Sequence, residues 1–396
     1  MSLPAVLRPG EIAGVETRNR IIRSSTSETM ADDSGIITQQ YHDFHTRLAR
    51  NGVGLIFTGH CSVHPRGNYI RGMTALDRDE VIGPMRKLTE AIHAEGGKIF
   101  AQLNHAGSQS RDESIEPLAP SVVENPQFHR LPLTAASSDE IWEAVEGFGN
   151  AARRVREAGF DGVHVHAGHG YLLSEFLSPA TNRREDEWGG SLENRQRLLL
   201  ETYKAMRTAV GDDFPITNKI GLWDYVPDGL TVEEGRATVT MMDNAGVDAI
   251  EISAGLMSPK AESAARYVGV TRRRALQDKL LHRVLAAPVK EAYYREEARR
   301  HRATARGKTI LVGGVRTIEL MNEVIEDGSA DFVSLARPFI REPDLVRQIE
   351  GGRTGMVDCV SCNICLMHEG SVPLKCWRES NVDLLKHAWA RVRGEV

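Results

Sequence analysis

The sequence predicts a parallel (β/α)8 barrel, and three observations carry that prediction. Strand-like segments alternate with helix-like segments along the chain, and eight such strands can be counted. Strand and helix alternate in the order that a parallel sheet with helical crossovers requires. The length of 396 residues exceeds an average domain but suits one enlarged barrel. A doubly wound open sheet is the alternative, and it is less favoured because no glycine-rich dinucleotide turn follows the first strand.

The expected strands are short apolar or alternating runs. In the fourth of them, Val163 and Val165 alternate with His164 and His166. The eight strands are Arg20–Ser24, Gly54–Thr58, Lys98–Leu103, Gly162–His166, Pro215–Ile220, Ala249–Ser253, Thr309–Val312 and Asp331–Leu335.

The expected helices are bounded by capping residues. Ser137 or Ser138, Ser191 and Thr231 are N-caps of three of them, and glycines close these three and two others. The helices are Gln39–Asn51, Glu80–Glu95, Ser138–Ala158, Ser191–Val210, Thr231–Ala245, His282–His301 and Ile318–Glu326. Two stretches do not fit a plain barrel repeat. Asn104–Ala136 is a long loop of the kind that usually carries function, and Ala254–Gly307 is long and rich in arginine.

The composition indicates a soluble globular protein, with 41% hydrophobic and 26% charged residues. A net charge of −5 argues against a nucleic-acid or membrane-surface role. No apolar run reaches the roughly 18 residues that span a bilayer. The N-terminus MSLPAVLRPGEI lacks a basic segment followed by an apolar one, so no signal peptide is expected. We therefore expect a cytoplasmic protein.

The cysteines point to metal or redox chemistry in a reducing compartment. Five cysteines in so long a chain do not make a disulfide framework, and four of them crowd into Cys359–Cys376. Cys359, Cys362, Cys365 and Cys376 supply the number of thiolates that a structural zinc or an iron–sulfur cluster requires. The spacing alone fits either metal site.

Polar residues follow the expected strands, and in a barrel these strand ends converge on the catalytic face. They are Ser24–Ser27, Gly59-His60, Gln102, the trio His166, His169 and Tyr171, Lys219, Ser253, Gly313-Gly314 and Ala336-Arg337. Histidine and tyrosine at a strand end can also merely satisfy backbone groups.

A phosphate site is expected after the seventh and eighth strands. Gly313-Gly314 would present backbone N–H groups, and Arg337 would make a two-pronged contact to the same anion. Alternatively, the glycine pair forms an ordinary tight turn that holds no ligand. With Gln102 and Lys219, the site suits a phosphorylated ring cofactor. Gln102 could instead be an ordinary hydrogen-bonded barrel residue, and Lys219 a buried lysine paired with an acid such as Asp224.

The stretch Asp161–Arg197 contains HAGHGYLLSEFLSPATNRREDEWGGSLENR, and four further motifs accompany it. They are NRIIRSS at Asn19–Ser25, FAQLNHAG at Phe100–Gly107, VGGV at Val312–Val315 and LARPFIREPDL at Leu335–Leu345. Together they resemble the Old Yellow Enzyme family of NADH:flavin oxidoreductases over roughly Leu7–Arg347. The resemblance implies a barrel that holds FMN, takes hydride from NADH or NADPH, and passes it from flavin N5 to an activated alkene.

The resemblance also implies roles for individual residues. Ser25, Thr26 and Ser27 would lie against the flavin, with Ser27 where the family usually has Thr or Cys. Gln102 would bind the pyrimidine edge, and Lys219 would stand beside N1 at a position more often Arg. Gly313, Gly314, Ala336 and Arg337 would hold the phosphate. His166 and His169 would bind the substrate oxygen, and Tyr171 would give the proton. His60 stands near the flavin where many relatives have a small residue, which leaves the substrate class in doubt.

The cysteine segment resembles the iron–sulfur segment of the larger relatives 2,4-dienoyl-CoA reductase and trimethylamine dehydrogenase. That resemblance implies a [4Fe–4S] cluster at the four cysteines, with zinc or metal-free thiols as alternatives. In those relatives nucleotide-binding domains follow, whereas this sequence ends at Val396. A separate protein would then have to supply that electron route. We expect an FMN-binding barrel over residues 1–350 and a C-terminal extension over residues 351–396.

Three functions remain open. The first is an NAD(P)H-dependent ene-reductase. The second is an oxidative amine dehydrogenase or demethylase, with Trp223 or Tyr225 joining Tyr171 in an aromatic cage for a cation. The third is a flavin subunit that docks to a redox partner through Arg266–Arg306, although such charge-rich stretches are usually solvated faces. The natural substrate, the nicotinamide preference and the oligomeric state, including a homo-oligomer, are not determined by the sequence.

Overall fold

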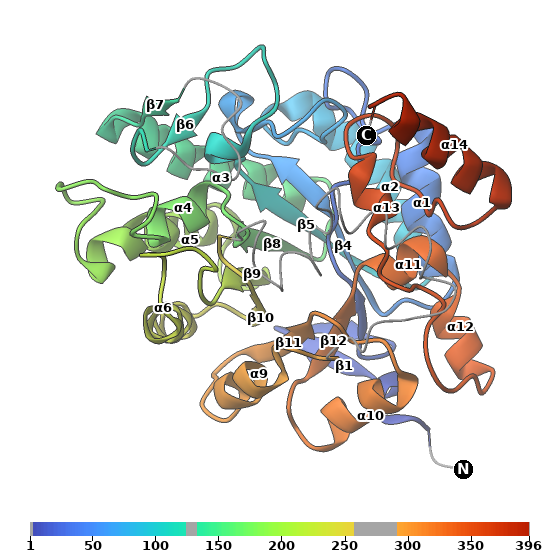
Figure 1. The fold of residues 1–396 in the computed structure, drawn as a ribbon. Coiled ribbons are helices and arrows are strands. Elements are labelled where there is room, and N and C mark those ends of the chain that lie inside the picture. The colour runs from blue at the N-terminus through green and yellow to red at the C-terminus, as the bar shows by residue number, and fades with distance from the viewer. Residues whose placement is uncertain (1–2, 124–132, 257–290, 396) are drawn as a thin grey trace.

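Eight parallel strands close into a barrel surrounded by helices (Figure 1). The computed structural model describes residues 3–123, 133–256 and 291–395. The strand order around the barrel is β10-β11-β12-β3-β4-β5-β8-β9, so β3 pairs with both β12 and β4. This closure confirms the predicted barrel and rules out the open sheet.

All eight predicted strands are present. They are β3 (Ile21–Arg23), β4 (Leu55–Ser62), β5 (Lys98–Asn104), β8 (Gly162–Ala167), β9 (Ile216–Gly221), β10 (Ala249–Ser253), β11 (Lys308–Val312) and β12 (Phe332–Leu335). The largest difference is in β4, which runs on from Thr58 to Ser62. Its register with β5 shifts between Phe57 and His60, and the pairing continues beyond the irregularity. His60 therefore lies within a strand, not in the loop after it.

The predicted helices pack outside the barrel, with ends close to those expected. They are α1 (Gln39–Arg50), α2 (Ile82–Ala94), α3 (Ser138–Glu157), α5 (Leu192–Val210), α6 (Val232–Ala245) and α10 (Ile318–Glu326). Ser137 and Thr231 form capping boxes with Glu140 and Glu234. Of the predicted helix His282–His301, residues 282–290 lie outside the described residues, and α9 covers Arg295–Arg302.

Several further elements were not predicted, and all except the 12-residue helix near the C-terminus are too short to show a periodic pattern. They are the hairpin β1 (Gly10–Ile12) and β2 (Val15–Thr17), the pair β6 (Leu118–Ala119) and β7 (Thr134–Ala135), the helices α4 (Leu172–Leu177), α11 (Arg337–Arg341), α12 (Leu345–Glu350), α13 (Ile364–Met367) and α14 (Asn381–Val392), and the 3-10 turns η1 (Ala5–Leu7), η2 (Pro65–Gly67), η3 (Asp79–Val81) and η4 (Gly107–Gln109).

Apolar side chains fill the end of the barrel next to the β1–β2 hairpin, whereas polar groups lie at the opposite, carboxyl end. The hairpin residue Ile12 joins Phe57, Phe100, Ile310 and Phe332 in one buried cluster. A larger apolar layer lies between the strands and the outer helices. The barrel is therefore closed at the hairpin end, and its carboxyl end is free to build a site.

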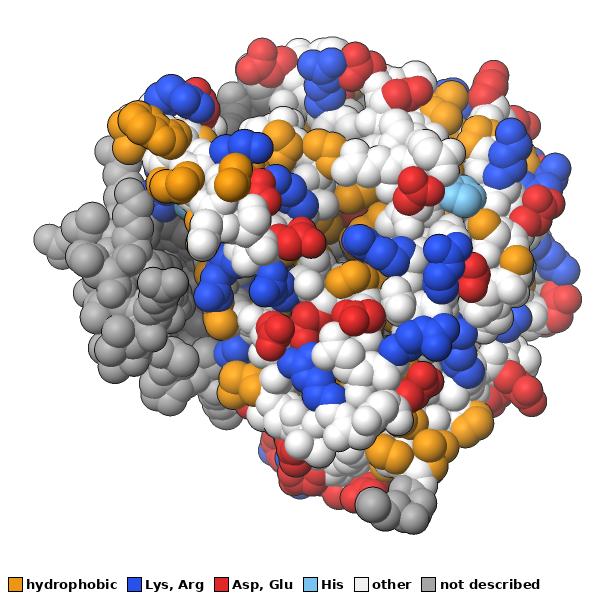
Figure 2. All heavy atoms as spheres, turned by 90° about the vertical axis from the view of Figure 1, so that its right-hand side faces the viewer, with side chains coloured by type: hydrophobic (Ala, Val, Ile, Leu, Met, Phe, Trp, Pro, Cys, Tyr) orange, Lys and Arg blue, Asp and Glu red, His pale blue; other side chains and the backbone are white. Residues whose placement is uncertain are grey.

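None of the described helices is long and apolar enough to cross a bilayer. Figure 2 shows acidic and basic side chains interspersed over the face that it displays. Part of the arginine-rich stretch, α9, is tied down by ion pairs such as Arg295 with Asp327 at 2.6 Å and Arg236 with Glu297 at 2.7 Å. Residues 257–290 of that stretch lie outside the described residues.

Candidate functional site

One pocket at the carboxyl end of the barrel brings together every residue that the sequence predicted for catalysis or cofactor binding. Residues at the ends of β11 and β12 line the side of the pocket where a phosphate was expected, and residues from the C-terminal segment form part of its wall. The lining residues are Ser25, Thr26, Ser27, His60, Tyr69, Gln102, Gln109, Arg111, His166, His169, Tyr171, Lys219, Tyr293, Val312, Gly313, Gly314, Val315, Arg316, Ser334, Leu335, Ala336, Arg337, Pro338, Ser361, Leu366, Met367 and Glu369.

A buried ionic network lies beneath the pocket and holds Lys219 in place. Lys219 Nζ is 2.8 Å from Glu251 Oε2 and donates to Ser24 Oγ at 3.1 Å. Burial alone would raise the pKa of Glu251, but Lys219 and His164 hold it well below its ordinary value. The lysine therefore is a buried paired residue, yet its partner is Glu251 and not Asp224. The pair keeps a cation at the pocket wall without leaving the charge uncompensated.

Three imidazoles face the pocket, and burial keeps them neutral. Burial is the largest cause in each case and lowers the pKa of His60 to about 4 and that of His169 to about 3, with Lys219 adding to both shifts. The pKa of His166 also lies well below its usual value, because of burial and then of its neighbour His169. Each ring therefore has one N–H donor and one acceptor nitrogen at neutral pH. His169 Nε2 contacts Ser253 Oγ at 2.8 Å, and Asn104 holds His60 Nδ1 at 2.9 Å.

Tyr171 lies among these rings at the start of α4. Its ring centroid is 4.9 Å from that of His166 and 5.3 Å from that of His60. His169, which precedes it by two residues, adopts a left-handed φ of +57° in the turn after β8. This turn brings both residues to the same side of the strand end. The described geometry thus joins two imidazoles and a phenol around one volume, as an oxygen anchor with a proton donor requires.

The loops after β11 and β12 form a backbone cradle. Gly313 and Gly314 have φ values of +100° and +73°. A Cβ at Gly313 would lie 2.6 Å from the Tyr293 ring, so a side chain does not fit there. Arg337 begins α11 and donates to Asn363 of the C-terminal segment. Both glycines line the pocket and pack closely against Tyr293, and their role in holding a phosphate stays a prediction.

Unpartnered polar atoms among the pocket residues fit a ligand such as FMN. Gln102 Nε2 and Ser25 Oγ are buried and have no hydrogen-bond partner among the described residues. Buried polar atoms are rarely left so, and a polar-edged ligand in the pocket would satisfy both. Thr26 is positioned by Arg23, which donates to Thr26 Oγ1 at 2.7 Å and pairs with Glu28 at 2.6 Å. The Gln102 amide and Lys219 suit the ring of such a ligand, and the Gly313-Gly314 cradle suits its phosphate.

The four C-terminal cysteines lie near one another beside this pocket. Burial raises the pKa of the Cys365 thiol to about 12; Arg337 opposes the shift, while Cys359, Cys362 and Cys376 add to it. Within the described ranges, no three His, Cys, Asp or Glu side chains are arranged to hold a metal ion. The thiol set has the right chemistry for a cluster, but its arrangement here is not a ligand shell. The iron–sulfur site stays a prediction, and no reaction step is routed through it.

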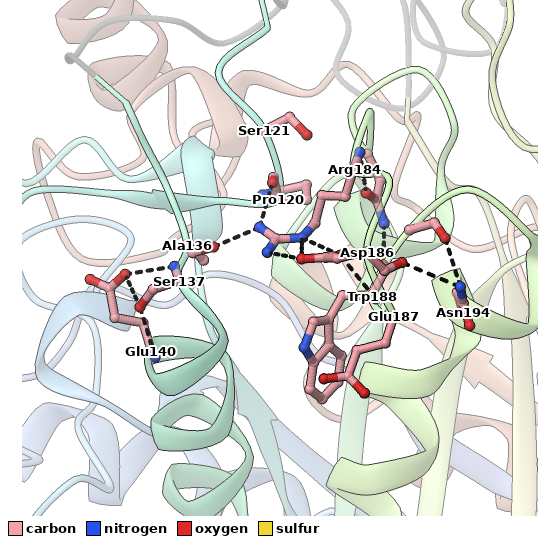
Figure 3. Close-up of polar contacts among 12 residues, drawn as sticks. Pro120, Ser121, Ala136, Ser137, Glu140, Arg184, Asp186, Glu187, Trp188 and Asn194 are labelled. Atoms are coloured by element: carbon pink, nitrogen blue, oxygen red, sulfur yellow. Dashed lines mark hydrogen bonds and ion pairs between the residues drawn. The ribbon is translucent and has the colours of Figure 1, made fainter.

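The second half of the Asp161–Arg197 stretch has a structural task. Arg184 donates to the carbonyl oxygens of Pro120 at 3.1 Å and Ala136 at 2.6 Å, and Asp186 accepts from the backbone N–H of Trp188 at 3.0 Å (Figure 3). The Arg184 contacts fasten the middle and the end of the long loop after β5 to the segment before α5. None of these residues lines the pocket.

Sequence reasoning missed several pocket residues. Tyr69, Arg111 and Glu369 all line the pocket, and Tyr69 Oη donates to Glu369 Oε2 at 3.0 Å. Arg111 belongs to the long loop that was expected to be functional, which was the one signal available. Trp223 and Tyr225, suggested for an aromatic cage, contact each other but do not line the pocket. Tyr69 instead packs edge-on against Tyr171, with the two ring centroids 5.6 Å apart.

Comparison with known proteins decides the family. The profile of the NADH:flavin oxidoreductase / NADH oxidase family matches residues 6–355. The chain belongs to this family. FMN is the family's cofactor and NADH or NADPH its reductant, so this family member is an FMN-dependent oxidoreductase.

Relatives of this NADH:flavin oxidoreductase differ in length and in the activities they are named for. NADH oxidase of Thermoanaerobacter brockii is 33% identical over 91% of this chain and 53% of its own length. N,N-dimethylglycine/sarcosine dehydrogenase of Chromohalobacter salexigens is 30% identical over 92% of this chain and 51% of its own. NADPH dehydrogenase of Geobacillus sp. is 33% identical over 85% and 90%. The chain thus spans about half the length of some curated relatives and nearly all of others.

Solved structures of similar proteins have the same fold. A 2-naphthoyl-CoA reductase complex superposes with a TM-score of 0.84 at 25% identity, over 96% of this chain and 57% of that one. Histamine dehydrogenase of Rhizobium sp. 4-9 gives 0.77 at 25% identity, over 96% and 53%. The old yellow enzyme homologue of Zymomonas mobilis gives 0.73 at 23%, over 91% and 96%, which supports the fold alone.

Proposed function

We propose that this flavin oxidoreductase is an ene-reductase that uses NADH or NADPH to reduce an alkene activated by a carbonyl or similar group. The observation that carries the proposal is the placement of His166, His169 and Tyr171 around one pocket volume. Bound FMN supplies the hydride transfer from the nicotinamide to the β-carbon of the alkene.

In this proposal the chain's own residues bind, polarise and protonate. His166 and His169 hydrogen-bond the carbonyl oxygen, and neutral rings suit this task because each can donate one N–H without a charge. His166 lines the pocket, and its buried Nδ1 has no hydrogen-bond partner among the described residues. The Tyr171 hydroxyl gives its proton to the α-carbon. Gln102 and Ser25 hold the ring system, Lys219 places a positive charge beside it, and Gly313, Gly314, Ala336 and Arg337 hold the phosphate.

Oxidation of an amine is the second candidate, and one feature favours it. Tyr69, Tyr171 and the Glu369 carboxylate share the pocket wall, and a cation can bind against such a set. Two relatives named above are amine dehydrogenases.

Anaerobic reduction of the purified protein separates the candidates. NADH, NADPH, dimethylglycine and histamine are each mixed with the yellow protein, and loss of flavin absorbance is followed. We expect rapid bleaching by a nicotinamide, reversal by an enone such as 2-cyclohexenone, and release of FMN on acid treatment. Bleaching by an amine and not by either nicotinamide would contradict the ene-reductase. If every small reductant fails but a partner protein restores reduction, the chain is a subunit of a larger redox assembly.

A further inference from the structure

The pocket wall carries a charged pair that the proposed reaction does not use. Arg111 follows η4 in the long loop after β5, and Glu369 follows α13 in the C-terminal segment. Arg111 Nη1 is 3.6 Å from Glu369 Oε2, and the two side chains are 29% and 15% exposed. The pair is therefore largely withdrawn from solvent and open to the pocket.

Tyr69 links this pair to the catalytic end of the pocket. Its hydroxyl donates to Glu369 Oε2, and the Arg111 guanidinium carbon lies 5.1 Å from its ring centroid. Tyr171 contacts the same ring edge-on, with the two ring centroids 5.6 Å apart. Burial is the main cause that raises the pKa of Tyr69 well above its usual value, so the hydroxyl stays a donor. The guanidinium and the proposed proton donor thus both contact one aromatic ring.

The Arg111 guanidinium has hydrogen-bonding capacity left. Its contact with Glu369 is longer than a hydrogen bond, and that carboxylate oxygen already accepts from Tyr69. No hydrogen bond from the Arg111 side chain is made within the described residues, although a guanidinium has five N–H donors. A planar donor fork of this kind matches a carboxylate.

The charge of the pocket favours an anion over a cation. Among the described lining residues, Arg111, Lys219, Arg316 and Arg337 are cationic, against the single carboxylate of Glu369. The charge of Lys219 is neutralised by the buried Glu251, and a phosphate would occupy the cradle beside Arg337. Neither group accounts for Arg111 and Arg316, and Arg316 donates to the Cys359 carbonyl at 2.7 Å. The one ion-pair partner of Arg111 among the described residues, Glu369, also accepts a hydrogen bond from Tyr69.

We propose that Arg111 binds a carboxylate at the end of the substrate remote from the alkene, so that the natural substrate is an activated alkene bearing a carboxylate. This inference rests on the proposed function for the alkene, but the carboxylate site itself does not. Arg111 would set specificity, with the Tyr69 ring beside its guanidinium and Glu369 as a competing carboxylate.

A binding experiment tests the site without turnover. Saturated keto acids of increasing length, from 4-oxopentanoate upward, and their primary amides are titrated calorimetrically into the oxidised holoenzyme. We expect the best keto acid to bind more tightly than its amide. Arg111→Gln should weaken the keto acid about 10- to 100-fold and leave the amide unchanged, because a charge-assisted contact is lost. Arg111→Lys should restore part of the preference, and FMN content and circular dichroism report whether each variant folds.

Two further variants complete the design. Arg153→Gln is the matched control, because Arg153 lies on α3 and pairs with Asp79 and Glu157 at the outer surface. It should change nothing. Glu369→Gln removes the competing carboxylate and should leave keto-acid binding unchanged or tighter.

The outcomes separate this inference from the proposed function. Equal binding of acids and amides, or equal weakening of both in Arg111→Gln, would overturn the carboxylate site even if enones are reduced. Retention of the acid preference with no enone turnover would leave the site standing and remove the ene-reductase. Amino ketones that bind through Glu369, lost in Glu369→Gln but kept in Arg111→Gln, would assign the pair to a cationic substrate and overturn the inference.

Discussion

At the scale of single residues, Tyr171 is the group on which the proposed reaction depends most directly. Tyr171→Phe should leave reduction of the bound FMN by nicotinamide nearly intact and slow reoxidation by an enone about 10²- to 10⁴-fold, because only the second step needs a proton donor. Stopped-flow measurement of both half-reactions tests this. Tyr203→Phe is the control, since the Tyr203 hydroxyl donates to the Gly246 carbonyl on the outside of the barrel. Equal rates in both half-reactions would mean that another group, such as His60 or water, delivers the proton.

Glu175 should make stability depend on pH. This carboxyl is buried in α4, where Ser108 donates to it through both its backbone N–H and its hydroxyl. Burial raises the pKa of Glu175 to about 8, and the Ser108 hydrogen bonds only partly oppose that rise. The folded protein therefore binds this proton more tightly than the unfolded chain does. The stability that the neutral carboxyl contributes is complete below the ordinary pKa of 4.5 and is lost as the pH rises toward about 8.

Comparison of the wild type with Glu175→Gln isolates this effect. Urea unfolding at several pH values between 5 and 9 should show the wild type losing stability relative to the variant, by at most about 1.4 kcal/mol per pH unit. Other titrating groups cancel in the difference between the two proteins. Parallel curves across this range would show that Glu175 is ionised in the folded state.

At the scale of elements, the turn after β11 has a backbone shape that only glycine can adopt there. Gly313→Ala should both strain the backbone and press on the Tyr293 ring, which a Cβ would approach to 2.6 Å. Gly328→Ala is a matched control: its φ is +71°, but a Cβ would meet no atom within 4 Å. Both should lose about 1 kcal/mol or more of stability to strain. Only Gly313→Ala should also weaken FMN binding, which fluorescence titration of the apoprotein measures. If the two variants bind FMN with equal affinity, the glycine cradle does not contribute to FMN binding.

At the scale of the whole molecule, the C-terminal segment is built into the same pocket as the barrel. The Leu374 N–H donates to the Glu28 carbonyl at 2.9 Å, and Arg316 donates to the Cys359 carbonyl at 2.7 Å. Glu369, Met367 and Leu366 line the pocket. A boundary near residue 350 stays a prediction, but removal of residues 351–396 would open one wall of the site.

The four cysteines of this segment are predicted to bind an iron–sulfur cluster. Anaerobically purified protein should contain about four irons per chain if the predicted [4Fe–4S] cluster forms. Cys365→Ser should lose the iron, whereas Cys61→Ser should retain it, because Cys61 is buried in β4 away from the other four. Metal analysis decides the matter. Less than about one iron per chain, with full FMN occupancy and no recovery on reconstitution, would refute the cluster. Stoichiometric zinc would assign the thiols to a structural site.

The sequence by itself determined the order of the eight strands, most helix caps and the set of residues at the strand ends. These are local properties: apolar runs, capping residues such as Ser137 and Thr231, and short motifs such as Gly313-Gly314 act over a few residues. Once a barrel is expected, its strand ends must converge, and so the proposed cofactor and catalytic residues could be named together.

Only the tertiary structure decided which distant residues meet. Lys219 pairs with Glu251 because β9 and β10 are neighbours in register, and Asp224, which is nearer in sequence, faces elsewhere. Tyr69, Arg111 and Glu369 come from three loops with no shared motif, and they meet because barrel closure and the returning C-terminal segment bring those loops over one pocket. Such contacts depend on the path of each loop, which local sequence preferences do not specify.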